Sequence, residues 1–93
     1  MAINDMISKD VTILNALGLH ARPAAQIAML AAKAVSHVWM ITDGEQVDAR
    51  SIIDMLTLYC PKGSSIRFAV ESTQDIDILN EIAALAENGF GEN

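Results

Sequence analysis

A histidine and an arginine stand two positions apart in the segment Gly18-Leu19-His20-Ala21-Arg22-Pro23. Pro23 is typical of the first turn of a helix, where its missing N–H group is not needed. Free backbone N–H groups and the helix dipole at such a position favour a bound anion. The guanidinium of Arg22 adds a fixed charge and a fork of donors that matches phosphate oxygens. The sequence therefore predicts an anion site beside His20.

The imidazole of His20 could itself carry a phosphoryl group. Its neutral form is available near neutral pH as a nucleophile, and a nitrogen–phosphorus bond is labile enough for the group to be passed on. Positioning and charge neutralisation provide most of what a protein contributes to phosphoryl transfer. We interpret His20 as a phosphoryl acceptor and Arg22 as the residue that stabilises the phosphate. An ordinary loop histidine beside a helix-starting proline is the alternative, and this short string alone does not exclude it.

The elements that must position this segment alternate between strands and helices. Apolar alternation and β-branched runs predict strands at residues 11–14, 38–42, 46–49 and 66–70. Helical spacing and capping residues predict helices at about residues 22–34, after Ser51 until Pro61, and from Ser72 to Gly89. Right-handed connections in this βαββαβα order place every helix on the same face. We expect an α+β open-faced sandwich: a four-stranded antiparallel sheet with three helices on one face, and Trp39 and Ile41 on the other.

Length and composition limit what the chain can be. Its 93 residues suit one domain, residues 1–93, of which 1–7 are expected to form a flexible N-terminal extension. Six basic against twelve acidic side chains argue against nucleic acid or an anionic membrane as a partner.

We expect a cytosolic protein, because we find no membrane-spanning run and no secretory signal at the N-terminus. Cys60 is expected to be a structural thiol. His37 is expected to be a surface residue, because no carboxylate or second histidine stands near it at ligand spacing in the sequence, and we expect neither a metal site nor a cofactor.

The segment Asn15 to Ala25, Asn-Ala-Leu-Gly-Leu-His-Ala-Arg-Pro-Ala-Ala, closely resembles the active-site segment of the HPr family. These are the histidine-containing phosphocarriers of the bacterial phosphotransferase system. The likeness continues through Ala49 to Ile53 and through Lys62-Gly63, so that it covers about Val11 to Gly89, and the predicted element order is also the family's. The segments 56–58 and 87–92 are similar to those of proteobacterial members and of the nitrogen-related branch, NPr, so that regulation rather than sugar uptake is open.

The resemblance implies a route for the phosphoryl group. Enzyme I, phosphorylated by phosphoenolpyruvate, would give the group to Nδ1 of His20, which would pass it to an EIIA-type acceptor. Arg22 would hold the phosphate, and the protein would act as a carrier and not as a turnover enzyme. Ser51 aligns with the serine that an HPr kinase/phosphorylase modifies in some lineages, although it could equally serve only as a helix N-cap.

The basic residues that many family members place around the histidine are missing here. The matching positions hold Met29, Ala32 and Asp54. Electrostatic steering toward enzyme I should then be weak, and docking would depend more on apolar contacts. The expected docking residues are Ala21, Ala25, Ile52, Ile53 and Leu56. These apolar side chains could also be a well-packed edge of the core, and a monomer is the default for a carrier that docks on several partners.

Two other functions are compatible with the sequence. The fold could serve as a regulatory interaction module controlled by phosphorylation of Ser51, with His20 idle, although relatives with only that role usually lose the histidine. A small-molecule-binding α+β domain would suit the composition and topology equally well. That third possibility leaves the arrangement of His20, Arg22 and Pro23 unexplained.

Overall fold

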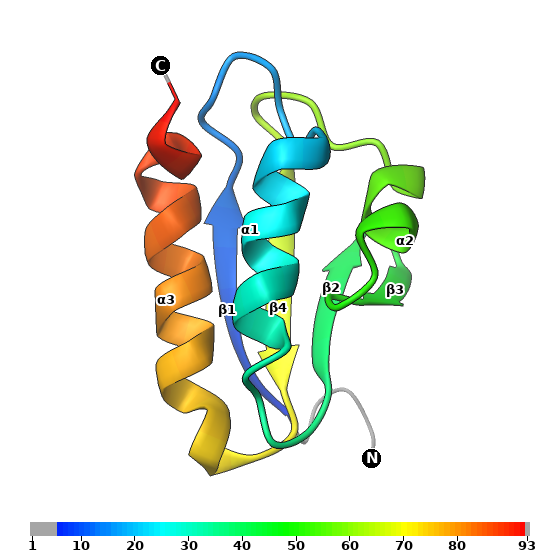
Figure 1. Ribbon diagram of the computed structural model, residues 1–93. Coiled ribbons are helices and arrows are strands. Elements are labelled where there is room, and N and C mark those ends of the chain that lie inside the picture. The colour runs from blue at the N-terminus through cyan, green and yellow to red at the C-terminus, as the bar shows by residue number, and fades with distance from the viewer. Residues whose placement is uncertain (1–5, 93) are drawn as a thin grey trace.

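The computed structural model describes residues 6–92, and these form a sheet covered by helices on one face (Figure 1). The sheet has four antiparallel strands in the order β1-β4-β2-β3. This arrangement confirms the predicted α+β fold. Within residues 6–92, no helix is long and apolar enough to cross a membrane. The elements are β1 (Ile7–Thr12), α1 (Ala21–Ala31), β2 (Val38–Thr42), β3 (Glu45–Asp48), α2 (Ile52–Thr57), β4 (Ser65–Val70) and α3 (Ile76–Glu87), with single 3₁₀ turns η2 (Thr73–Asp75) and η3 (Gly89–Gly91) around α3.

The first strand begins earlier than the apolar pattern predicts. β1 pairs with β4 from Ile7, opposite Val70, to Thr12, opposite Ser65, whereas the expected strand covered residues 11–14. Ser8, Lys9 and Asp10 are exposed, so apolar alternation does not mark this half of the strand. Ile7 therefore does not belong to the flexible extension expected at residues 1–7, and residues 1–5 lie outside the described residues.

Both long helices are shorter than predicted, because tight turns replace one end of each. α1 ends at Ala31, and the chain continues in three-residue turns in which Lys33 N–H donates to the Leu30 carbonyl at 3.0 Å. The segment from Ser72, which the sequence predicts as part of the helix, instead forms the turn η2, and this turn contains Asp75. Asp75 is buried, and its carboxylate accepts from the backbone N–H groups of Val35 and Ser36 at 2.8 and 3.1 Å. These hydrogen bonds connect the segment that follows α1 to the turn that precedes α3.

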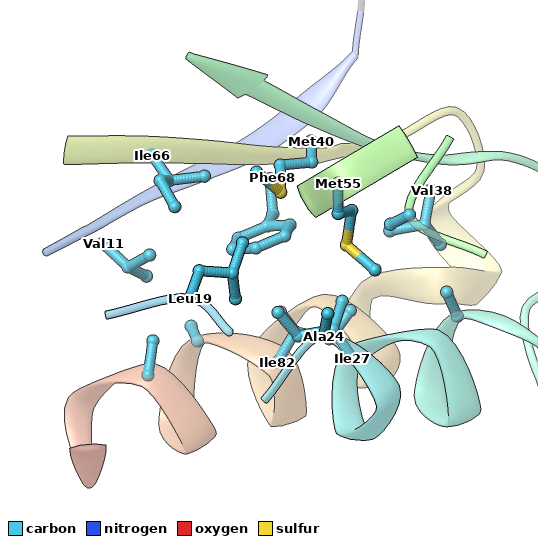
Figure 2. Packing of buried hydrophobic residues seen from close by; sticks show 14 of the residues in the cluster. Val11, Leu19, Ala24, Ile27, Val38, Met40, Met55, Ile66, Phe68 and Ile82 are labelled. Carbon is cyan, nitrogen blue, oxygen red and sulfur yellow. The ribbon is translucent and has the colours of Figure 1, made fainter. Parts of the chain in front are cut away.

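The hydrophobic core lies between the sheet and the helices (Figure 2). Phe68 and Met40 extend from the sheet toward Ile27 of α1 and Ile82 of α3, and Met55 of α2 lies at the same layer. All five side chains are fully buried. Because burial of an aliphatic or aromatic side chain contributes about 1.5–3 kcal/mol, this core holds α1 firmly on the sheet. The start of α1 is therefore a fixed platform for the residues it carries.

On the other face of the sheet, Trp39 and Ile41 alternate with buried Val38, Met40 and Thr42, as expected for strand residues that point away from the helices. Trp39 is partly covered, because His37 stacks on its indole at a ring distance of 4.9 Å and Glu71 accepts its Nε1–H at 2.8 Å. Glu71 also lies 3.8 Å from Nδ1 of His37. His37 is exposed as predicted, and strand pairing brings Glu71 near it from a distant part of the chain.

Candidate functional site

The loop before His20 is held against the segment that follows α2. The backbone N–H of Leu19 donates to the carbonyl of Cys60 at 2.8 Å, and Gly18 lies at a φ of +70°. A Cβ at Gly18 would come within 2.6 Å of the Cys60 carbonyl oxygen and 2.8 Å of Pro61 Cα. Only glycine suits both the left-handed backbone and this close approach. Gly18 therefore determines where His20 enters the helix.

His20 is the N-cap residue of α1. Its backbone is extended (φ −95°, ψ −172°), its carbonyl accepts from Ala24 N–H at 3.1 Å, and its side chain makes no capping hydrogen bond. The imidazole is 34% exposed, enough for a partner to reach it. Arg22 is exposed in the first turn and makes no ion pair within the part of the chain that is described. The structure thus places both His20 and Arg22 at the start of α1.

A carboxylate that the sequence analysis missed contacts the histidine. Glu92 Oε2 lies 2.7 Å and Oε1 3.0 Å from Nε2 of His20. The same Oε1 accepts a hydrogen bond from Nδ2 of Asn15 at 2.9 Å, and Nδ2 also donates to the Gly18 carbonyl at 2.7 Å. Figure 1 shows the reason for the proximity, since the C-terminal end of the chain lies beside the loop that leads into α1. No spacing pattern could have found this contact, because the two residues are 72 positions apart.

Hydrogen bonding and nearby charges favour the ionised form of Glu92. The bond from Asn15 is the largest cause that lowers the pKa of this carboxyl below its usual value, and the bond and charge of His20 and the charge of Arg22 act in the same direction. Desolvation opposes them. An ionised carboxylate can only accept, so Nε2 must be the donor in a neutral His20 ring. By this inference from the hydrogen-bond partners, Nδ1 carries the lone pair that a nucleophile requires.

Ser51 lies at the N-cap of α2, and its Oγ accepts from the backbone N–H of Asp54 at 3.2 Å. The capping role that we considered as the alternative is therefore present in the structure. Cys60, which anchors the His20 loop through its carbonyl, has a buried thiol. Burial, and secondarily the charge of Asp43, raises the pKa of this thiol, which disfavours a reactive thiolate.

The expected docking residues lie on α1 and α2, which pack against each other. Ala21 is exposed and Ala25 half-buried on α1, whereas Ile52, Ile53 and Leu56 are all exposed on α2. Ile53 is 76% exposed, and the buried residue of this short helix is Met55. We call the three exposed apolar residues of α2, Ile52, Ile53 and Leu56, the apolar patch. Met29, Ala32 and Asp54, which stand where relatives have basic residues, are also exposed.

Comparison with known proteins places this geometry in a family. Residues 7–88 match the family described as PTS HPr component phosphorylation site. The chain belongs to the HPr family. It is 39% identical to phosphocarrier protein HPr of Cupriavidus necator over 94% of this chain and 98% of that protein. It is 33% identical to phosphocarrier protein NPr of Klebsiella oxytoca, again over 94% and 98% of the two chains.

The fold of this HPr-family chain is also that of solved HPr structures. HPr-C-His from Thermoanaerobacter tengcongensis superimposes with a TM-score of 0.87 and 32% identity, covering 95% of this chain and 99% of the other. HPr proteins are phosphocarriers, as the names of these relatives state, and a general phosphocarrier role is therefore supported for this chain. Glu92 lies beyond residue 88, where the family match ends.

Proposed function

We propose that this protein accepts a phosphoryl group from phosphorylated enzyme I on Nδ1 of His20 and donates it to an EIIA-type protein. The single observation that carries this proposal is the position of His20 in an HPr-family chain. His20 is a half-buried N-cap histidine whose imidazole is 34% exposed, Arg22 lies in the first helical turn, and Nε2 of His20 is already engaged by a carboxylate. The phosphoryl group would originate in phosphoenolpyruvate, and the protein would be a transfer intermediate without turnover chemistry of its own.

The transfer step requires little rearrangement at His20. The lone pair on Nδ1 forms a bond to phosphorus, while the bond from phosphorus to the donor atom breaks and its electron pair remains with the donor. The proton on Nε2 stays in place. The first-turn N–H groups of α1 and the guanidinium of Arg22 would offset the phosphate charge. Passing the group on reverses these events, with the acceptor's nucleophile in place of the donor atom.

Docking of enzyme I and of the acceptor would use the apolar patch together with Ala21 and Ala25. Exposed apolar side chains grouped on one surface are typical of protein interaction sites. The formal net charge of −6 and the exposed Asp54 disfavour electrostatic attraction to an acidic partner. We propose a monomer that acts in the cytosol, since each docking event would use the same surface of a single chain.

Ser51 is a proposed regulatory site, in which a kinase would add a phosphate beside the apolar patch. The doubly charged group would suit the start of α2 but would oppose docking of an acidic partner. Ser51→Asp retains an N-cap and adds a charge, whereas Ser51→Asn retains an N-cap without the charge. We expect Ser51→Asp alone to slow phosphorylation of His20 by enzyme I. Equal rates in the two variants would contradict a regulatory effect of charge at this position.

The carrier function is tested by incubating the protein with phosphoenolpyruvate, magnesium and enzyme I from the same organism, followed by measurement of the intact mass. Wild-type protein should gain one phosphoryl mass that acid removes. His20→Ala should gain nothing, whereas His37→Ala, which removes the other histidine of the chain, should be modified like wild type. An unmodified wild-type protein would contradict the proposed function.

A further inference from the structure

We infer that Glu92 is a positioning residue for phosphoryl transfer, whose carboxylate keeps the proton of the imidazole on Nε2 and orients the ring of His20 with Nδ1 available as the nucleophile. This inference rests on the proposed function of His20 and adds to it a residue from the opposite end of the chain. Glu92 itself touches neither the donor atom nor the phosphoryl group, so it acts through His20.

The contact between Glu92 and His20 is held by a third residue. Both carboxylate oxygens lie within hydrogen-bond distance of Nε2, at 2.7 and 3.0 Å, and Asn15 Nδ2 donates to one of them at 2.9 Å. Asn15 is 1% exposed, and its second bond to the Gly18 carbonyl ties it to the loop that carries the histidine. A buried amide with two fixed bonds has little freedom to turn. The carboxylate is therefore positioned by the same loop that positions the imidazole.

The backbone before Glu92 is also held in place. The ring of Phe90 is buried in the core, and its backbone lies at a φ of +58°, which is unfavourable for a residue with a side chain. Such a conformation persists only where the surrounding packing maintains it. The backbone N–H of Glu92 donates to the Gly89 carbonyl at 2.9 Å. The buried Phe90 ring and this turn direct the side chain of Glu92 toward His20.

The charge of Glu92 fits the change in the histidine during transfer. Once phosphorus is bonded to Nδ1 and the proton remains on Nε2, the imidazole ring carries a positive charge. The carboxylate lies 2.7 Å from the protonated nitrogen and offsets that charge. It does not need to take the proton, and its lowered pKa keeps it ionised near neutral pH. Glu92 thereby stabilises both the reactive tautomer and the phosphorylated ring.

The test compares Glu92→Ala and Glu92→Gln with wild type and with Glu87→Gln. Glu87 is an exposed residue at the end of α3, so its substitution removes the same charge from the same region without touching His20. Two quantities are measured: the initial rate of phosphorylation by enzyme I, and the ¹⁵N chemical shifts of the His20 ring in the unphosphorylated protein. The ring shifts report the tautomer, which a purely structural role of Glu92 would not change.

We expect Glu92→Ala to slow phosphorylation about 10- to 100-fold, by analogy with the loss found when the carboxylate partner of a metal-ligating histidine is removed. Glu92→Gln should slow it less, because its carbonyl oxygen can still accept from Nε2. Wild type should show a proton on Nε2 and none on Nδ1, and Glu92→Ala should show a mixture of tautomers. Glu87→Gln should match wild type in both measurements.

Two failures are distinguishable. If wild type is phosphorylated and Glu92→Ala reacts at the same rate with unchanged ring shifts, the inference about Glu92 is overturned while the proposed function stands. If wild type is not phosphorylated at all, the proposed function fails, and the transfer role of Glu92 fails with it. In the second case the ring shifts would still show whether Glu92 sets the tautomer of His20.

Discussion

At the scale of single residues, the site divides its tasks among side chains with different chemistry. In the proposed transfer, a ring nitrogen of His20 would act first as nucleophile and then as leaving group, and the guanidinium of Arg22 would supply a positive charge beside it. Glu92 contacts Nε2 of His20 at 2.7 Å, the nitrogen that would not react in the proposed transfer. Because these three residues come from the start of α1 and from the C-terminal tail, the site depends on the docking of the tail as well as on the helix.

Two substitutions of Arg22 distinguish the effect of its charge from the effect of its fork of hydrogen-bond donors. Arg22→Ala removes both, and we expect phosphorylation of His20 to slow about 100-fold, the lower end of what loss of one transition-state donor costs. Arg22→Lys keeps the charge but loses the fork of donors, and should be intermediate. Because Arg22 is exposed, thermal unfolding should change little in either variant. Rates are measured with enzyme I at limiting concentration, and a wild-type rate in Arg22→Ala would exclude a role in holding the phosphate.

At the scale of elements, the backbone conformation of the loop between β1 and α1 sets the position of His20. Its Gly18 adopts a φ of +70° and lies against the backbone of Cys60 and Pro61. The helix it leads into is fixed by the core, and the segment it rests on leads from α2 into β4. Gly18 therefore lies where the loop between β1 and α1 contacts the segment between α2 and β4, two residues before His20, the N-cap of α1.

The variant Gly18→Ala tests this dependence, with Gly44→Ala as its control. Gly44 has a similar φ of +78° but has no atom within 4 Å of an added Cβ. Both substitutions should lose about 1–3 kcal/mol of unfolding free energy from backbone strain. Gly18→Ala should lose more, because its Cβ would meet the Cys60 carbonyl at 2.6 Å, and it alone should slow phosphorylation of His20. Chemical denaturation and the transfer assay measure the two effects, and equal losses in both variants would contradict the account.

Most of these elements could be predicted from the sequence, because amphipathic periods and caps are local signals. The two strands expected at residues 38–42 and 46–49, which pair as β2 and β3, and the Ser51 cap are examples that the structure confirms. The N-terminal half of β1 could not be predicted from the sequence, because Ser8, Lys9 and Asp10 show no apolar alternation and form a strand by pairing with β4. The same limit applies to the site. His20 and Arg22 are neighbours in sequence, whereas Glu92 lies beside His20 only because the packing of α3 and Phe90 brings the C-terminal end of the chain there.

At the scale of the whole molecule, the proposed phosphoryl acceptor His20 and the apolar patch both lie at the surface of an acidic chain. α1 carries His20, and α2, packed against it, carries the patch. A net charge of −6 provides no broad attraction to an acidic partner. Recognition should therefore depend on the contact area of the patch and only weakly on salt concentration.

The variant Ile53→Ser tests the apolar patch. Ile53 is 76% exposed, so its replacement should leave stability nearly unchanged while weakening docking by about 1–2 kcal/mol, or about 5- to 30-fold in transfer efficiency. The control is Val35→Ser, which removes a side chain of similar exposure, 67%, in the loop beyond the far end of α1. Kinetics at increasing enzyme I concentration should show a defect in Ile53→Ser alone. A defect of equal size in both variants would argue against a specific docking role.

The most direct test of the central claim is to locate the phosphoryl group on the protein itself. Protein labelled with ¹⁵N is phosphorylated with phosphoenolpyruvate, magnesium and enzyme I, and ³¹P–¹⁵N coupling is measured at neutral or alkaline pH, where phosphohistidine survives. We predict a single coupling, to Nδ1 of His20, with Nε2 still protonated. Coupling to Nε2 would contradict the tautomer imposed by Glu92. A phosphoryl group on another residue, or none, would contradict the assignment of His20 as the carrier.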